Sequence, residues 1–228
     1  VALLVRLVLP RHLGPSVFGE YAFAEALAIT GFAFVGFGLD MYIQKEIPRR
    51  PEHASDFYGG TQVVRLFVGA AVVVAVGAVA HRSGHSREVV LAAMTFGLAQ
   101  LALYAANTCA TLLYAARRVG RLSVLNITTK LLWAGAIVAA LVGRAHLWAY
   151  AAAAALSELV RFVALFAMAR RIVGLEVRFD FGETFRVLVK SAPYYVNLIA
   201  IVLYSKIDVT IMGFLLPKLH ALLCLCSF

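Results

Sequence analysis

The chain has 228 residues, of which 62% are hydrophobic and only 14% are charged, and its mean hydropathy is +0.86. Soluble domains carry about 25% charged residues, so this composition excludes a water-soluble globular fold. The formal net charge is +9. The basic residues lie in short segments between apolar runs, which is typical of membrane topology rather than of nucleic-acid binding. We therefore expect a membrane protein with no nucleic-acid partner.

The apolar runs predict the helices in chain order. A helix needs about 20 apolar residues to cross the hydrocarbon core of a bilayer. A partial run over residues 1–9 is interpreted as the end of a truncated first helix. Six full runs follow, over residues 17–40, 58–80, 89–116, 123–143, 146–170 and 188–216. Because the runs are long and do not alternate, the predicted fold class is all-α: a polytopic membrane helix bundle of about seven transmembrane helices.

Short polar segments connect these runs. Gly14 and Pro15 indicate a turn between the first two helices. Pro48 and Pro51 flank two arginines and are expected to prevent a helix through that connection. The glycines at the end of the second run, Gly31, Gly36 and Gly38, are interpreted mainly as tight packing positions, with local loosening of the helix as the alternative.

The basic residues of alternate connections predict the orientation. One set of connections and their edges carries Lys45, Arg49, Arg50, Arg117, Arg118, Arg121, Arg170, Arg171, Arg178, Arg186 and Lys190. The other set carries only Arg11, Arg82, Arg87 and Arg144. Cytoplasmic loops are enriched in lysine and arginine. The sequence therefore predicts a multi-pass protein of the cytoplasmic (inner) membrane with its N-terminus in the cytoplasm.

Several ionisable residues lie inside the predicted spans, where they are costly and usually face a bundle interior or a wet cavity. The basic ones outnumber the acidic ones. Arg6, Arg65, Lys130, Arg161 and Lys206 are the candidates for substrate binding in a cavity, and Glu25, Glu158 and Asp208 are the candidates for coupling or gating. This surplus of positive charge suits an anionic cargo, and arginine suits phosphate.

Spacing predicts some partners for these residues. Glu158 and Arg161 are separated by three positions and are expected to pair on one helix face. Lys206 and Asp208 point apart, so each needs a partner elsewhere. For Asp208 an interhelical salt bridge and a titratable or cation-binding role both remain open. Tyr194, Tyr195, Trp133 and Trp148 are interpreted as interfacial aromatic residues, with sugar stacking as the alternative.

No enzyme or cofactor motif is present. The sequence contains no P-loop, no His-Glu-x-x-His and no Gly-x-Ser-x-Gly. Its cysteines, Cys109, Cys224 and Cys226, form no disulfide framework and no metal-ligand pattern. We therefore expect no catalytic residue, no metal site, no cofactor and no enzymatic activity.

A series of motifs resembles a known family. The motifs are PRHLGPSVFGEYAFA over residues 10–24, FGLD over 37–40, QKEI over 44–47, Gly59 and Gly60 with Arg65, and YSKIDVTIMG over 204–213. In this order and spacing they resemble the Wzx-type polysaccharide flippases of the multidrug/oligosaccharidyl-lipid/polysaccharide transporter superfamily.

The resemblance implies two six-helix lobes around a central cavity. It also implies movement of undecaprenyl-pyrophosphate-linked oligosaccharide to the outer leaflet by alternating access, for O-antigen, capsule or exopolysaccharide synthesis. The implied partners are the lipid-linked oligosaccharide, membrane lipids and other polysaccharide assembly proteins. Residues 1–186 would form the N-terminal lobe and residues 187–216 the first helix of the C-terminal lobe. Residues 217–228 are expected to be an atypical, aberrant tail, so that the chain is an incomplete transporter.

Two alternative functions remain at this point. A cation-coupled multidrug or lipid-precursor exporter of the same superfamily would use Glu25 and Asp208 as coupling carboxylates. A membrane-embedded polysaccharide polymerase or ligase is disfavoured, because the predicted outward connections are too short for the large loop that such enzymes carry.

Overall fold

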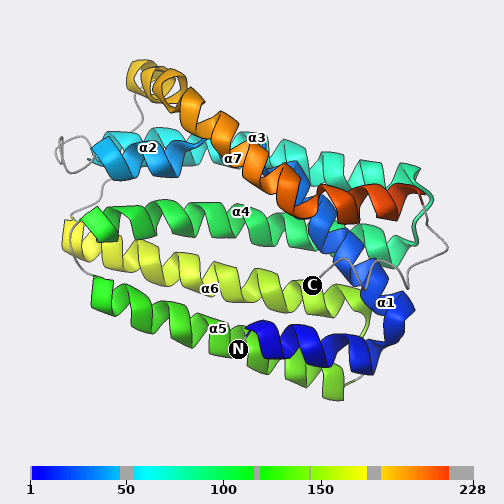
Figure 1. Ribbon diagram of the computed structural model, residues 1–228. Coiled ribbons are helices and arrows are strands. Elements are labelled where there is room, and N and C mark those ends of the chain that lie inside the picture. Colours follow the sequence, from blue (N-terminus) through cyan, green and yellow to red (C-terminus); the bar gives the residue numbers. More distant parts are fainter. Residues whose placement is uncertain (1, 47–53, 116–118, 144, 174–180, 216–228) are drawn as a thin grey trace.

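The computed structural model describes the backbone of residues 2–46, 54–115, 119–143, 145–173 and 181–215. Within these ranges the regular structure is entirely α-helical, as the sequence predicted (Figure 1). The helices are α1 (Ala2–Phe32), α2 (Leu39–Glu46), α3 (Ala54–Arg82), α4 (Arg87–Ala115), α5 (Val119–Val142), α6 (Leu147–Val173) and α7 (Phe181–Leu215). The connection with Pro48 and Pro51 and the tail over 217–228 lie outside the described residues.

Four of these helices match the predicted spans closely. Within the described residues, the segments Tyr58–Arg82, Arg87–Tyr114, Gly120–Val142 and Leu147–Ile172 are long and apolar enough to cross a membrane. They belong to α3, α4, α5 and α6, and their bounds differ from the predicted ones by only a few residues. The protein is therefore an all-α membrane helix bundle.

The helices at the start of the chain differ from the prediction. The expected helices over 1–9 and 17–40 form one element, α1, and the expected loop between them is helical except at Gly14. Gly14 has φ of 78° and ψ of 162°, and Pro15 follows it. Glycine adopts this backbone conformation readily, and proline can open a new helical segment because it needs no N–H partner there. The predicted turn is thus a sharp kink.

The second predicted span also ends earlier than expected. It was predicted to reach residue 40, but α1 ends at Phe32, and Leu39 begins a separate short helix, α2, inside the expected loop. Phe37 and Gly38 have positive φ values of 48° and 62°, which interrupt the helix. We call residues 33–38 the α1–α2 junction. At the other end of the chain, α7 begins at Phe181 rather than at the predicted residue 188.

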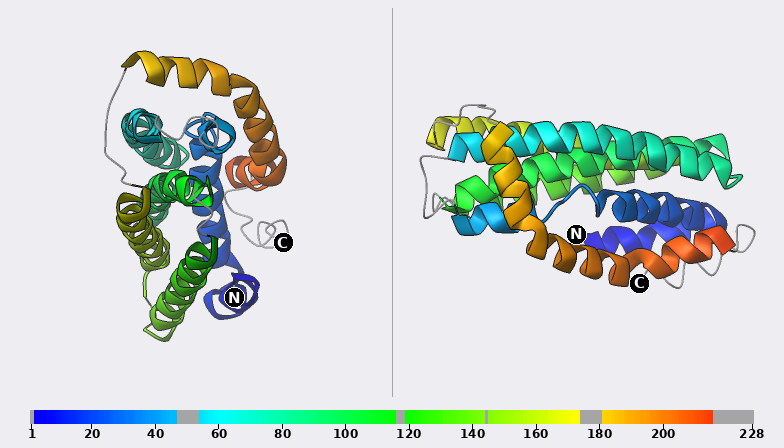
Figure 2. Two further views of the ribbon diagram at one scale, coloured as in Figure 1. Left: turned by 90° about the vertical axis from the view of Figure 1, so that its left-hand side faces the viewer. Right: turned by 90° about the horizontal axis from the view of Figure 1, so that it is seen from above.

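Helix α4 lies at the centre of the bundle and packs mainly against α6, α3 and α1. The left view of Figure 2 shows the long helices end-on, with α7 crossing one side of the bundle and changing direction along its length. Two apolar clusters occupy opposite ends. One includes Phe23, Phe96 and Tyr150, and the other includes Ile43, Leu113 and Leu165. The polar side chains described next lie along α4 between and beside these clusters.

Candidate functional site

Two polar networks lie on different faces of α4. Thr108 belongs to one network and its neighbour Asn107 to the other, because successive side chains of a helix point about 100° apart. The junction network consists of Asp40, Arg65, Tyr104, Thr108 and the carbonyl of Gly36. The Glu158 cluster consists of Asn107, Asn126, Lys130, Glu158 and Arg161.

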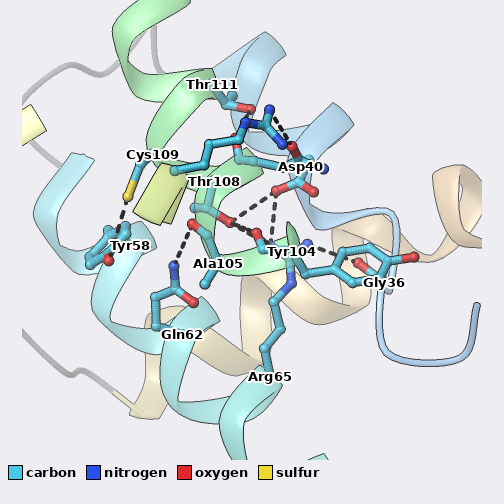
Figure 3. A network of polar contacts seen from close by, with 12 residues as sticks. Gly36, Asp40, Tyr58, Gln62, Arg65, Tyr104, Ala105, Thr108, Cys109 and Thr111 are labelled. Atoms are coloured by element: carbon cyan, nitrogen blue, oxygen red, sulfur yellow. Dashed lines mark hydrogen bonds and ion pairs between the residues drawn. The ribbon is translucent and has the colours of Figure 1, made fainter. Parts of the chain in front are cut away.

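The junction network is built around the Arg65 side chain of α3, which is only 1% exposed (Figure 3). Its Nη1 donates to Asp40 Oδ1 at 2.9 Å and to the Tyr104 carbonyl at 3.2 Å, and it also contacts Thr108 Oγ1. Its Nη2 donates to the Gly36 carbonyl at 3.2 Å. The guanidinium also lies 5.3 Å from the centre of the Tyr104 ring.

This arrangement encloses the charge of Arg65 in protein groups. Thr108 donates its hydroxyl to Asp40 at 3.0 Å, so the same carboxylate oxygen accepts from two residues. A buried arginine is stable only when it is paired and hydrogen-bonded. These contacts satisfy both Nη atoms, while the buried Nε has no hydrogen-bond partner among the described residues. The network therefore fixes the backbone at Gly36 and the start of α2 to α3 and α4. The predicted contact of Arg65 with an anionic cargo stays a prediction, and in this conformation its guanidinium faces protein groups.

The Glu158 cluster joins α4, α5 and α6. Glu158 on α6 accepts from Lys130 Nζ on α5 at 3.2 Å and from Arg161 Nη1 at 3.1 Å. The second of these contacts confirms the predicted pair at spacing i, i+3. Arg161 also donates through Nε to Asn126 at 3.0 Å and through Nη2 to Asn107 at 3.2 Å.

The cluster has more positive than negative charge at mid-span. One carboxylate faces two cations, and the asparagines add only neutral oxygens. The side chains of Glu158 and Arg161 are 11% and 13% exposed, but that of Lys130 is 52% exposed. Lys130 Nζ lies 5.8 Å from the centre of the Trp133 ring. In the segment Gly120–Val142, Lys130 is about 15 Å from one end and about 18 Å from the other, at 1.5 Å per residue.

An exposed ammonium at this depth does not suit contact with lipid tails. A charge at the bilayer centre costs about 2.5–3.5 kcal/mol by insertion scales, so it turns toward water or a partner group. Among the predicted site residues whose side chains the structure describes, Lys130 is therefore the best placed to meet an anion.

The other predicted site residues are not brought into either network by the contacts described above. Glu25 lies partly buried on α1 and takes part in an interaction of its own. The side chains of Arg6, Lys206 and Asp208 lie outside the described residues. Tyr194 and Tyr195 lie against the α1–α2 junction, and Trp148 is 47% exposed at the start of α6. Among the described residues, no group of three or more His, Cys, Asp or Glu side chains is arranged to hold a metal ion.

The structure adds residues that the sequence reasoning missed. Asp40 was placed at the end of a span, and Asn107, Asn126 and Thr108 were not considered. A partial signal was present: two asparagines and a threonine lie in otherwise apolar runs, where an unpaired polar group is costly. Their partners were not evident, because they lie on other helices.

A family model described as "Polysaccharide biosynthesis protein" matches residues 1–221. No curated protein and no solved structure matches the chain.

Proposed function

The chain belongs to the polysaccharide biosynthesis protein family, and from this premise we propose that it is a flippase for lipid-linked oligosaccharide. The cargo is an oligosaccharide on undecaprenyl pyrophosphate. The protein moves it across the cytoplasmic membrane by alternating access, for O-antigen, capsule or exopolysaccharide synthesis. It performs no covalent chemistry and is not an enzyme. Its N-terminus lies in the cytoplasm.

The observation that carries this proposal is the half-exposed Lys130 at mid-span. Its ammonium has three N–H donors, and among the described residues it donates one hydrogen bond, to Glu158. Neighbouring Arg161 keeps Glu158 neutralised, so an anion that approached Lys130 would not leave the carboxylate unpaired. A pyrophosphate group that crosses the membrane needs such a cation along its path, because an unpaired phosphate in a low-dielectric region is very costly.

The sequence positions of two further cavity candidates support the same proposal. Arg6 and Lys206 would add positive charge to the path of the pyrophosphate, while the undecaprenyl tail stays in the bilayer. Membrane lipids and other polysaccharide assembly proteins are the proposed partners. Coupling through Glu25, Glu158 or Asp208 is part of the proposal, and Glu158 would couple through a change in its pairing with Lys130.

The test is complementation of a flippase-null cell with the full-length protein. Lys130→Ala is expected to reduce surface glycan strongly at normal protein levels, because Glu158 keeps Arg161 as its partner and the bundle stays intact. The matched control is Lys190→Ala, which removes an exposed lysine from α7 and is expected to leave surface glycan unchanged. Normal surface glycan with Lys130→Ala at equal expression would contradict the proposed role of Lys130.

The same cells separate the flippase from a multidrug exporter. Accumulation of the undecaprenyl-linked oligosaccharide inside cells that carry Lys130→Ala is expected for a flippase. Failure of the parent protein to restore glycan, together with a drug resistance that is lost in Lys130→Ala, would favour the exporter. A protonophore added to cells with the parent protein reports whether a proton gradient drives the movement.

A further inference from the structure

Helix α7 lies directly against the α1–α2 junction. A Cβ atom added at Gly38 would lie 2.5 Å from the Tyr195 backbone nitrogen and 2.7 Å from the Tyr194 carbonyl carbon. At Gly36 it would lie 2.6 Å from a methyl group of Leu198. The absence of side chains at these two positions is therefore what lets α7 approach the junction, and at Gly38 the approach is backbone to backbone.

The junction side of this contact is held firmly. Leu39 and Ile43 of α2 are fully buried in an apolar cluster with α4 and α6. Arg65 ties the Gly36 carbonyl and Asp40 to α3 and α4. Buried packing together with a buried, hydrogen-bonded ion pair resists displacement. The surface that receives α7 is thus part of the rigid bundle.

The α7 side of the contact is held more weakly after Pro193 than before it, since Val187 and Ser191 are buried whereas Val196 and Ile201 are 69% and 53% exposed. Its side-chain hydrogen bonds are exposed: Lys45 Nζ donates to Tyr194 Oη at 3.2 Å, and Tyr195 Oη donates to the Phe34 carbonyl at 3.5 Å. Exposed hydrogen bonds of this kind contribute little net stability because water replaces them readily. Tyr195 also contacts the Phe37 ring, with centroids 5.5 Å apart.

A break in α7 lies next to this contact. Pro193 immediately precedes Tyr194 and Tyr195, and proline removes one backbone hydrogen bond of the helix and bends it. Figure 2 shows the change of direction of α7. A bend at the point of a weak contact lets one part of a helix move while the other part stays packed.

We propose that Gly38, Lys45, Tyr194 and Tyr195 form a releasable latch, which holds α7 against the rigid α1–α2 junction in one conformation and opens at the Pro193 bend in another. The α7 latch does not depend on the identity of the cargo. It assigns Arg65 the role of a positioning residue, which keeps the receiving surface in place. It also makes α7, rather than α2, the element that moves.

The variants are chosen to change the latch and little else. Gly38→Ala places a methyl group against the α7 backbone. Its control is Gly84→Ala, because Gly84 also has a positive φ, of 77°, but has nothing within 4 Å of the added atom. Both variants place alanine at a positive φ, and only the one at Gly38 meets α7. Lys45→Met and Tyr194→Phe each remove the exposed hydrogen bond and keep the bulk of the side chain.

The readout is the reactivity of a cysteine at Leu198, which follows the Pro193 bend and has a methyl group against Gly36. It is introduced as Leu198→Cys in the full chain, with Cys109, Cys224 and Cys226 replaced by alanine. Maleimide labelling is followed in membranes. Gly38→Ala is expected to raise the labelling rate about fivefold, which corresponds to a shift of about 1 kcal/mol in a two-state equilibrium. Lys45→Met and Tyr194→Phe are expected to raise it about twofold.

Labelling with Gly84→Ala is expected to equal that of the Leu198→Cys parent. Equal rates in all backgrounds, with each protein eluting as a single folded species, would overturn the latch. If Gly38→Ala fails to fold, Lys45→Met and Tyr194→Phe decide the question, and an unchanged rate in both overturns it. Because no glycan is measured, failure of the latch is distinguishable from failure of the flippase assignment.

Discussion

Replacement of Arg65 by alanine is expected to destabilise the bundle severely. The change removes the ion pair with Asp40 and the donors to Gly36, Tyr104 and Thr108. Breaking a buried ion pair costs about 3–5 kcal/mol, because the remaining charge is uncompensated. The Asp40 side chain is 27% exposed, so water can solvate it, and we expect the lower end of that range, about 3 kcal/mol.

The assay is thermal unfolding of the purified protein in detergent, followed by circular dichroism. A loss of about 3 kcal/mol lowers the apparent Tm by about 6–12 °C for a chain of this length. Arg82→Ala is the matched control, because Arg82 is exposed at the end of the same helix. Its expected effect is under about 0.5 kcal/mol.

A third variant tests the geometry of the network. Arg65→Lys keeps the charge but loses the planar fork that reaches the Gly36 carbonyl and Asp40 together, so its Tm is expected to fall between those of Arg65→Ala and the parent. An Arg65→Ala protein that melts within about 2 °C of the parent would refute the reasoning that the junction network stabilises this bundle.

The remaining predictions concern α5, α6 and the contact between α3 and α7. Glu158→Gln leaves two cations without a counter-charge, and its expected cost is about 1–3 kcal/mol in the same melting assay; a Tm equal to that of the parent would show that the cluster contributes no stability. Gly60→Ala is expected to lower the Tm, because the added Cβ would lie 2.0 Å from the hydroxyl of Thr184, which is only 9% exposed. Gly135→Ala on α5 meets nothing within 4 Å and is expected to stabilise by about 0.5–1 kcal/mol; similar effects at both glycines would contradict the packing described for Gly60.

The predicted spans are accurate where hydropathy alone decides a helix. The runs behind α3, α4, α5 and α6 are long and apolar, and a membrane segment must satisfy its backbone hydrogen bonds internally, so a helix is the only choice. The prediction was wrong at residues 33–40, which were assigned to a span but form the α1–α2 junction and the start of α2. Phe37 illustrates why the prediction failed there. Its φ is positive, a conformation that a non-glycine residue rarely adopts unless tertiary contacts hold it.

The candidate site could be predicted only in part. The Glu158 and Arg161 pair follows from helical spacing, since positions i and i+3 lie on one face. Lys130 joins that pair from another helix, so no spacing rule reveals it. Arg65 was recognised as costly in a membrane, but its partner Asp40 lies 25 residues away along the chain, on an element that was not predicted.

The sequence by itself therefore determined that this chain is a helical membrane protein, because the free energy of placing long apolar runs in water or lipid depends on composition more than on neighbours. Its charges also determined that several spans need polar or charged partners inside the bundle. Which groups act as these partners was decided only by the tertiary structure. Ion pairs act over a few ångströms, and the packing of α4 against its neighbours brings Asp40 to Arg65 and Lys130 to Glu158.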